Sequence, residues 1–199
     1  MLLVLGTHNK KKGVELRQLL EPFGFELKTL ADFSNAIEVV EDGDSFQANA
    51  RLKAEQQAVN LGAWVLGEDS GLCVDALAGR PGIFSARFSG EDATDEKNNA
   101  FLLEQLAGVP IEKRTAHYVC HMSLSDPEGN VKLDCEETCC GRILESARGT
   151  GGFGYDPLFE IPEYHATFGE MGSSVKAMLS HRSRAMRKFV PQLVRVTRE

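Results

Sequence analysis

The chain has 199 residues, of which 42% are hydrophobic and 26% are charged, and its formal net charge is −7. These values fit one globular domain covering residues 1–199, and the negative charge argues against a general nucleic-acid binder. No apolar run approaches the roughly 20 residues that span a bilayer. The first apolar run precedes the lysines, the reverse of a secretory signal, so we expect a cytoplasmic protein that does not contact membranes.

Predicted strands and helices alternate through the first half of the chain. Leu16, Leu19, Leu20 and Phe23 recur with helical spacing after a short apolar strand. Asp44 followed by Gln47 is typical of a helix start, and the apolar stripe of that second helix is mostly alanine. In chain order we expect strands at 2–5, 26–30 and 64–68, helices over 16–23, 46–61 and 95–108, and an irregular glycine-rich segment at 77–92.

The second half begins with a predicted hairpin. Residues 116–125 and 131–143 alternate between apolar and polar positions around a DPEGN turn, which predicts two long paired strands. His117 and His121 fall on the opposite face from the apolar residues, and we interpret them as solvent-facing or paired rather than as ligands. A glycine loop at 149–157 follows, and a last helix begins near Ser180. Together these elements predict an α/β fold with a mixed sheet.

Of the five cysteines, Cys135, Cys139 and Cys140 lie close enough in sequence to suggest a metal cluster, but strand geometry argues against one. On a strand, Cys135 and Cys139 share a face but lie about 13 Å apart, and Cys139 and Cys140 point to opposite faces. We therefore interpret them as small buried thiols in a reducing compartment.

Glu68 and Asp69 are the first candidates for chemistry. They follow the apolar run of residues 64–67, and Ser70 and Gly71 are expected to turn the chain away from the strand. A carboxylate beside the core is unfavourable unless it is paired. Either the two acids simply begin a loop, or they hold Mg²⁺, which prefers oxygen ligands. Glu41 is then a candidate third carboxylate.

Three further stretches could bind an anion or a planar ligand. THNKKKG, at residues 7–13, opens a helix with lysines beside free backbone N–H groups, although it is not a P-loop. GTGGFG, from Gly149, is followed by prolines that exclude a dinucleotide-binding helix, so it forms backbone turns or presents aromatic rings to a ligand. SHR at 180–182 opens the last helix, in a basic segment that begins at Lys176. Either Ser180 simply caps the helix, or His181 and Arg182 also donate hydrogen bonds to a ligand there.

In order along nearly the whole chain, these stretches resemble the inosine/xanthosine triphosphate pyrophosphatase family. THNKKK is similar to T-G-N-x-x-K, and EDGDSFQANARLKA is similar to E-x-G-x-[ST]-F-x-E-N-A-x-x-K-A. The run from GEDSGL to ATD, with GTGGFGYDP and SHR, completes the resemblance. It implies a long central mixed β-sheet flanked by helices, two lobes around an active-site cleft, and a homodimer.

The resemblance also implies a reaction and a site. Purine nucleoside triphosphates carrying inosine, deoxyinosine or xanthosine would be hydrolysed to monophosphate and pyrophosphate with Mg²⁺. Asp69 would activate the water and, with Glu41, serve the metal, with Glu68 beside them. The residues that would contact the phosphates are Thr7, Asn9, Lys12 and Lys53, and His8, Lys10 and Lys11 beside them would also bind the substrate. The residues that would form the base-side pocket are Phe153, Gly154, Tyr155, Asp156, Lys176, His181 and Arg182. Ser70 would touch the nucleotide.

Four positions depart from the family pattern. His8 stands in place of glycine, Ala48 in place of glutamate, and Ser174 and Val175 in place of acids. The first two support an alternative hypothesis, a nucleotide sensor that binds without turnover. A nucleic-acid module acting through the basic segment is a further alternative, and the net charge disfavours it.

Overall fold

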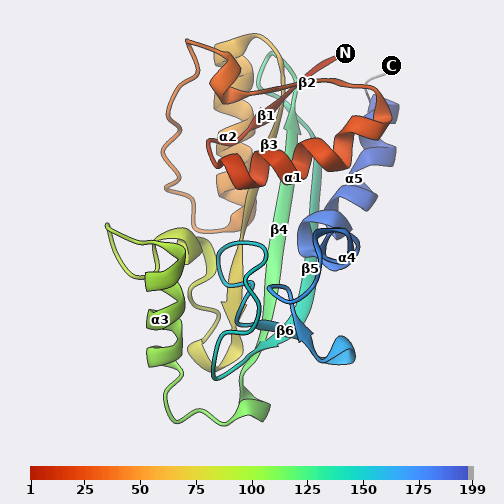
Figure 1. Cartoon of the computed structure of the whole chain (residues 1–199). Helices are drawn as coiled ribbons and strands as arrows, with labels where there is room; N and C mark the ends of the chain where they lie inside the picture. The colour runs from red at the N-terminus through yellow and green to blue at the C-terminus, as the bar shows by residue number, and fades with distance from the viewer. Residues whose placement is uncertain (197–199) are drawn as a thin grey trace. The chain divides into compact units, whose positions relative to one another are not determined.

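The computed structural model describes residues 1–196 of the chain as a single sheet with helices beside it (Figure 1). Short 3₁₀ turns join several of the elements. The strands are β1 Leu2–Gly6, β2 Glu26–Thr29, β3 Trp64–Val74, β4 Thr115–Ser125, β5 Val131–Ile143, β6 Phe159–Ile161 and β7 Ala166–Thr167. The helices are α1 Lys10–Leu20, α2 Phe46–Leu61, α3 Asp95–Gln105, α4 Ser173–Leu179 and α5 His181–Val196.

The sheet is mixed, as predicted. Its seven strands are ordered β2-β1-β3-β4-β5-β6-β7. Strand β1 runs parallel to both β2 and β3, whereas β5 pairs antiparallel with β6, and β6 with β7. Parallel neighbours require a crossover connection, and α1 supplies it between β1 and β2. The α/β class and the mixed sheet with flanking helices are therefore confirmed.

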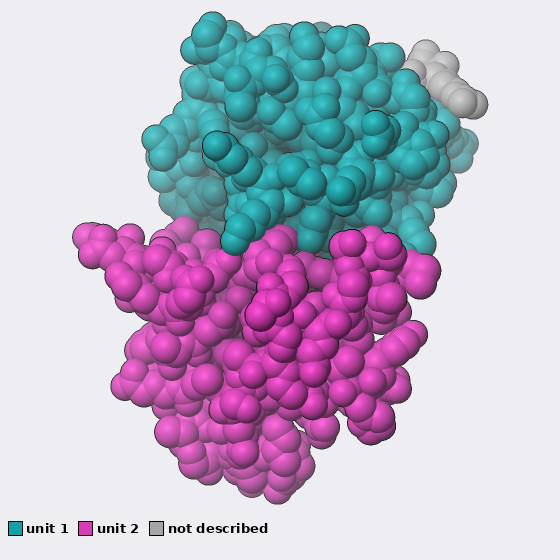
Figure 2. Space-filling view, viewed as in Figure 1, with its two compact units in different colours: residues 1–69, 120–137, 182–199 teal, residues 70–119, 138–181 magenta. Residues whose placement is uncertain are grey.

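The chain divides into two compact units (Figure 2). Unit 1 comprises residues 1–69, 120–137 and 182–199, and unit 2 comprises residues 70–119 and 138–181. Each unit has its own buried apolar cluster.

Unit 1 buries apolar side chains on both faces of its strands. Leu3, Leu5 and Leu66 belong to one cluster with residues of α1 and α5, whereas Val4 and Val65 belong to another with Ala58 of α2. Successive residues of a strand point to opposite faces, so this division follows from the alternation along β1 and β3. Helices α1 and α5 thus cover one face of these strands, and α2 covers the other.

Unit 2 is held together by an aromatic cluster. Tyr118 lies with its ring centroid 4.6 Å from that of Phe159, and Phe159 stacks 5.4 Å from Phe168. Leu72 and Leu102 are fully buried in the same cluster. The apolar alternation of residues 116–124, visible in the sequence, places Tyr118 there.

Two local predictions were wrong. Strand β3 does not end at Glu68 but continues to Val74, so both acids lie inside the strand. The cap of α2 is Ser45, whose hydroxyl accepts a hydrogen bond from the N–H of Ala48, rather than Asp44. A serine is as good an N-cap as an aspartate, so the composition at these two positions did not decide between them.

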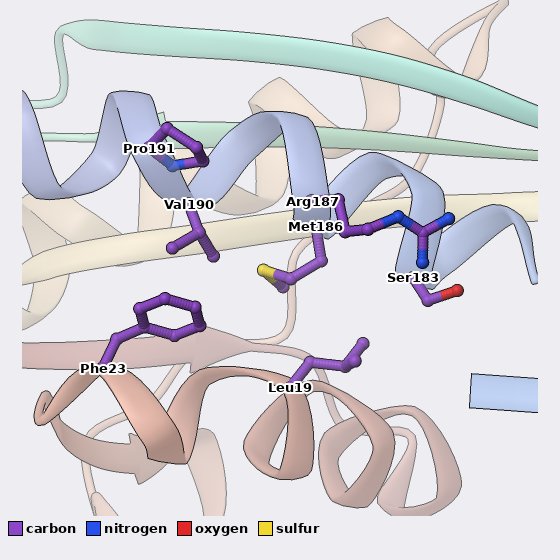
Figure 3. A pocket seen from close by; sticks show the side chains of 7 residues that line it. All are labelled: Leu19, Phe23, Ser183, Met186, Arg187, Val190 and Pro191. Carbon is purple, nitrogen blue, oxygen red and sulfur yellow. The ribbon is translucent and has the colours of Figure 1, made fainter. Parts of the chain in front are cut away.

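The helix predicted over residues 16–23 both begins and ends earlier than expected. Helix α1 runs from Lys10 to Leu20, and Phe23 lies in a 3₁₀ turn and is 51% exposed. Together with α5 it borders a shallow hollow of about 190 Å³ (Figure 3). The residues lining the hollow are Leu19, Phe23, Ser183, Met186, Arg187, Val190 and Pro191.

No helix in residues 1–196 is long and apolar enough to cross a membrane.

The cysteines in residues 1–196 form no disulfide; Cys120 and Cys139 are buried as predicted, whereas Cys140 is exposed. His121 is paired, with its ring nitrogens 3.0 Å from Asp134 and 3.2 Å from Glu136.

Candidate functional site

Gly67 brings helix α2 against strand β3. A methyl group at Gly67 would lie 2.1 Å from the carbonyl oxygen of Ala50 and 2.8 Å from the amide nitrogen of Ala54. Only glycine permits this approach, since no side chain fits between strand and helix. The close approach brings Lys53 of α2 next to Asp69, the next residue of β3 on the same face as Gly67.

We expect Gly67→Ala to lower the free energy of unfolding by about 1–3 kcal/mol or more, because backbone atoms of α2 must shift. Chemical denaturation measures the change. Gly172→Ala is the matched control, since a methyl group there meets no atom within 4 Å. Equal stability of the two variants would contradict the close packing of α2.

Glu68 and Asp69 point to opposite faces of β3. Glu68 continues the face of Leu66, which is covered by α1 and α5, and Asp69 continues the face of Val65, which is covered by α2. Both are almost fully buried, with 1% and 6% exposed. The two adjacent acids are thus compatible with a buried strand because each has cationic partners on its own face.

Glu68 is held by two cations and a thiol. Its Oε2 lies 3.0 Å from Nζ of Lys12 in α1, and its Oε1 accepts a hydrogen bond of 2.9 Å from the guanidinium of Arg182. Cys120 also donates to Oε1, over 3.4 Å. The opposite side of the Arg182 guanidinium pairs with Glu15 of α1. Burial alone would lower the pKa of Arg182, but Glu68 and Glu15 outweigh it and raise that pKa.

Asp69 shares a lysine with Glu41. The Lys53 ammonium donates 2.9 Å hydrogen bonds to Asp69 Oδ1 and to Glu41 Oε2. The second oxygen of Asp69, Oδ2, is buried and accepts no hydrogen bond from any residue in the described range. A buried carboxylate oxygen without a partner is unfavourable in the protein alone, so it indicates a position for a ligand or a water.

The pKa values of Asp69 and Lys53 are both raised, for different reasons. Burial raises the pKa of Asp69 beyond what Lys53 and Lys12 offset. Burial would lower the pKa of Lys53, but Asp69, Glu41 and Glu68 together raise it. The Lys53 ammonium therefore stays charged, while Asp69 holds its proton more tightly than an ordinary aspartate. A carboxylate with a raised pKa is a better general base near neutral pH.

The 7–13 segment forms the start of α1 next to this group. Because Gly6 of β1 pairs with Gly67 of β3, the segment begins level with Glu68. Asn9 is the N-cap, and its side-chain oxygen accepts from the N–H groups of Lys11 and Lys12. Two of the backbone donors expected to bind an anion are therefore already capped. The side chains of His8, Lys10 and Lys11 are exposed.

In unit 2, the predicted base-binding residues form a second group around Asp156. The Asp156 Oδ2 accepts hydrogen bonds from the Phe153 N–H at 2.8 Å and from Lys176 at 2.6 Å. The Lys176 ammonium lies 4.5 Å from the centroid of the Phe153 ring. Gly152 has a φ of 73°, and a methyl group there would lie 2.0 Å from the Asp156 carboxylate. The glycine loop is thus fixed from within by one buried acid.

The remaining contacts of this group fix the loop and His181 from outside. Tyr155 donates from its hydroxyl to the carbonyl of Ser85 over 2.8 Å, and Asn99 donates to the carbonyl of Gly154 over 2.9 Å. Burial raises the pKa of the Tyr155 hydroxyl. The His181 ring is buried and stacks on Tyr118, with centroids 4.6 Å apart and planes within 11°.

The structure brings most of the predicted site residues into these two groups. Thr7, Asn9, Lys12, Glu41, Lys53, Glu68, Asp69 and Arg182 belong to unit 1, and Ser70, Phe153–Asp156, Lys176 and His181 to unit 2. Glu15, Cys120 and Tyr118 were not predicted. Each is far in sequence from its partner, and none lies in a motif, so no local signal marks them.

A metal ion at this site would have few protein ligands. No group of three or more histidine, cysteine, aspartate or glutamate residues between positions 1 and 196 is arranged to hold an ion. Mg²⁺ usually takes only one or two carboxylates and completes its shell with waters and phosphates. The partnerless Asp69 Oδ2 and the nearby Glu41 carboxylate fit this kind of site.

The chain is similar to known proteins over nearly its full length. The Ham1 family model matches residues 3–192. A Rhodopirellula baltica protein named dITP/XTP pyrophosphatase is 56% identical, and the match covers 98% of this chain and 93% of that protein. One of the same name from Desulforamulus reducens is 46% identical, with 98% and 97% covered.

Solved structures give the same result. A HAM1 protein from Coxiella burnetii superposes with a TM-score of 0.90 at 33% identity, and the match covers 98% of this chain and 99% of that one. A structure from Mycobacterium abscessus titled nucleoside-triphosphatase / dITP/XTP pyrophosphatase has a TM-score of 0.78 at 39% identity, with 97% and 100% covered.

Proposed function

The chain belongs to the Ham1 family, and from that premise we propose that it hydrolyses inosine, deoxyinosine and xanthosine triphosphates to monophosphate and pyrophosphate. The activity removes aberrant purine nucleotides from the nucleotide pool. The observation that carries the proposal is the buried Asp69, with one oxygen held by Lys53 and the other without a partner among the described residues.

Asp69 is the proposed general base. Its carboxylate takes a proton from a water that attacks the α-phosphorus; the bond between that phosphorus and the bridging oxygen breaks, and pyrophosphate leaves with the electron pair. Lys12 and Lys53 stabilise the charge on the departing group. Thr7 and Asn9 complete the proposed phosphate contacts, with His8, Lys10 and Lys11 as further substrate-binding residues. Ser70, next to Asp69 in β3, touches the nucleotide.

Mg²⁺ is the proposed cofactor, held by Glu41 and Asp69. When bound, it supplies Lewis-acid stabilisation of phosphate charge. Glu68 faces the other side of the strand, where Lys12 and Arg182 hold it, so its supporting role is to fix Lys12 rather than to bind the ion.

The base contacts are proposed for the group around Asp156. Phe153 stacks on the purine, and Gly154, Tyr155, Asp156 and Lys176 shape its surroundings. His181 and Arg182 donate hydrogen bonds to the oxo groups at positions 6 and 2, with Arg182 fixed by Glu15 and Glu68. An amino group in place of an oxo group would leave buried donors unsatisfied, which is a strong form of discrimination.

We expect pyrophosphate, not orthophosphate, as the product. The test incubates the protein with eight nucleoside triphosphates and Mg²⁺, and measures both products with and without added inorganic pyrophosphatase. Turnover should be highest with inosine and xanthosine triphosphates and should stop when the metal is chelated. Orthophosphate appearing without the added enzyme, with diphosphate accumulating, would contradict attack at the α-phosphorus. Binding of the same nucleotides without either product would identify a sensor.

A cytoplasmic homodimer that binds neither nucleic acid nor membranes completes the proposal. The negative net charge of the chain supports the absence of nucleic-acid binding. Sedimentation of the purified protein tests the dimer.

A further inference from the structure

Lys53 is bonded to the same two carboxylate groups that the proposed metal would use, those of Asp69 and Glu41. Its ammonium comes from α2, its side chain is 11% exposed, and it lies 2.9 Å from both Asp69 Oδ1 and Glu41 Oε2. An ammonium offers three donors and a compact positive charge. Lys53 therefore bridges two acids that come from different elements, a loop and a strand.

A divalent cation cannot simply join this arrangement. It would enter at Asp69 Oδ2, the buried oxygen without a hydrogen-bond partner in the described chain. The Lys53 ammonium would then lie within a few ångströms of a doubly charged ion, and like charges so close repel strongly at a buried site. To bind Glu41 through Oε2 as well, the ion must replace the ammonium there.

We infer that Lys53 is an internal counter-ion of Asp69 and Glu41, which a divalent cation must displace. This inference deepens the proposed function and rests on it. In the nucleotide-free protein, the ammonium weakens metal binding. A triphosphate gives the displaced ammonium new anionic partners, so metal and nucleotide bind together more tightly than either binds alone. Lys53 thereby makes the site favour the metal–nucleotide complex over the metal alone.

Lys12 provides the matched control. It is also a largely buried lysine paired with an acid of β3, but its partner is Glu68, on the other face of the strand. It acts on Asp69 only through longer-range electrostatics. Lys12→Met and Lys53→Met each remove one positive charge from the same cluster, and only the second removes the direct competitor.

The experiment measures Mn²⁺ binding to the nucleotide-free protein by electron paramagnetic resonance. Lys53→Met should bind Mn²⁺ at least about tenfold more tightly than wild type, a difference of one decade in Kd. Lys12→Met should change the affinity by less than about threefold. Unchanged or weaker binding by Lys53→Met, or an equal gain in both variants, would overturn the inference.

A second measurement uses the wild-type protein, so the result does not depend on how well a variant folds. In crystals grown with Mn²⁺ and pyrophosphate, Lys53 should lie beyond hydrogen-bond distance from Glu41 Oε2. Mn²⁺ bound to Asp69 with Lys53 still on Glu41 Oε2 would overturn the displacement. Failure of the wild-type protein to release pyrophosphate from inosine triphosphate would instead overturn the proposed function.

Discussion

Asp69→Asn is expected to lower kcat/KM for inosine triphosphate by about 10²–10⁴-fold, the range for loss of a general base. The amide keeps the shape of the side chain but loses the negative charge and the basic lone pair. Weaker metal binding would add to the loss. Pyrophosphate release measures the rate, and thermal unfolding shows whether the variant keeps its fold.

Glu68→Gln is the matched control, one residue earlier in the same buried strand. Its carboxylate already interacts with Lys12, Arg182 and Cys120, so it is not available to take a proton from water. The substitution should therefore reduce the rate less than Asp69→Asn does, while lowering stability through the two cations that it leaves undercompensated. The reverse ranking of the two rates would assign the base to Glu68.

The pH profile gives a second test of the same assignment. Asp69 acts as a carboxylate, and burial raises its pKa, so the active form is lost as the pH falls through that raised pKa. The acid limb of kcat/KM, which reports the free enzyme, should thus lie above the roughly 3.9 of an ordinary aspartate. Residual activity of Asp69→Asn should lack this limb. Circular dichroism at each pH separates titration from unfolding.

Arg182→Ala is expected to lower the free energy of unfolding by about 3–5 kcal/mol, the usual effect of removing one partner of a buried ion pair. Arg182 is 1% exposed, and its guanidinium pairs with both Glu68 and Glu15. Its loss leaves a fully buried carboxylate with Lys12 as its remaining cation in an ion pair among the described residues. Denaturant unfolding measures the change. Arg184→Ala, at an exposed position of the same helix, should change stability far less.

The same variant tests base recognition. If Arg182 also donates to the base, turnover of inosine triphosphate should fall several-fold more than the residual turnover of ATP. The ratio of the two kcat/KM values is insensitive to the fraction of folded protein. An equal loss of turnover on both substrates would mean that Arg182 forms the ion pairs but does not recognise the base.

Local patterns in the sequence determined the elements of this protein and the motifs that they carry. The alternation along residues 116–124 and 131–143 predicted β4 and β5, and the glycine loop before Tyr155 was recognised as irregular. These features are readable because strand and helix periods are set by a residue's near neighbours. The motif order was sufficient to identify the family and to select Asp69, Lys12 and Lys53.

Tertiary structure alone decided how the charged residues are paired. Ser70 and Gly71 are typical of a turn, yet β3 remains extended through them, because pairing within the sheet overrides local preference. That extension places Glu68 and Asp69 on opposite faces. Arg182 meets Glu15 and Glu68 across separations of 167 and 114 residues. No local pattern encodes such contacts, because they depend on which helix packs against which face of the sheet.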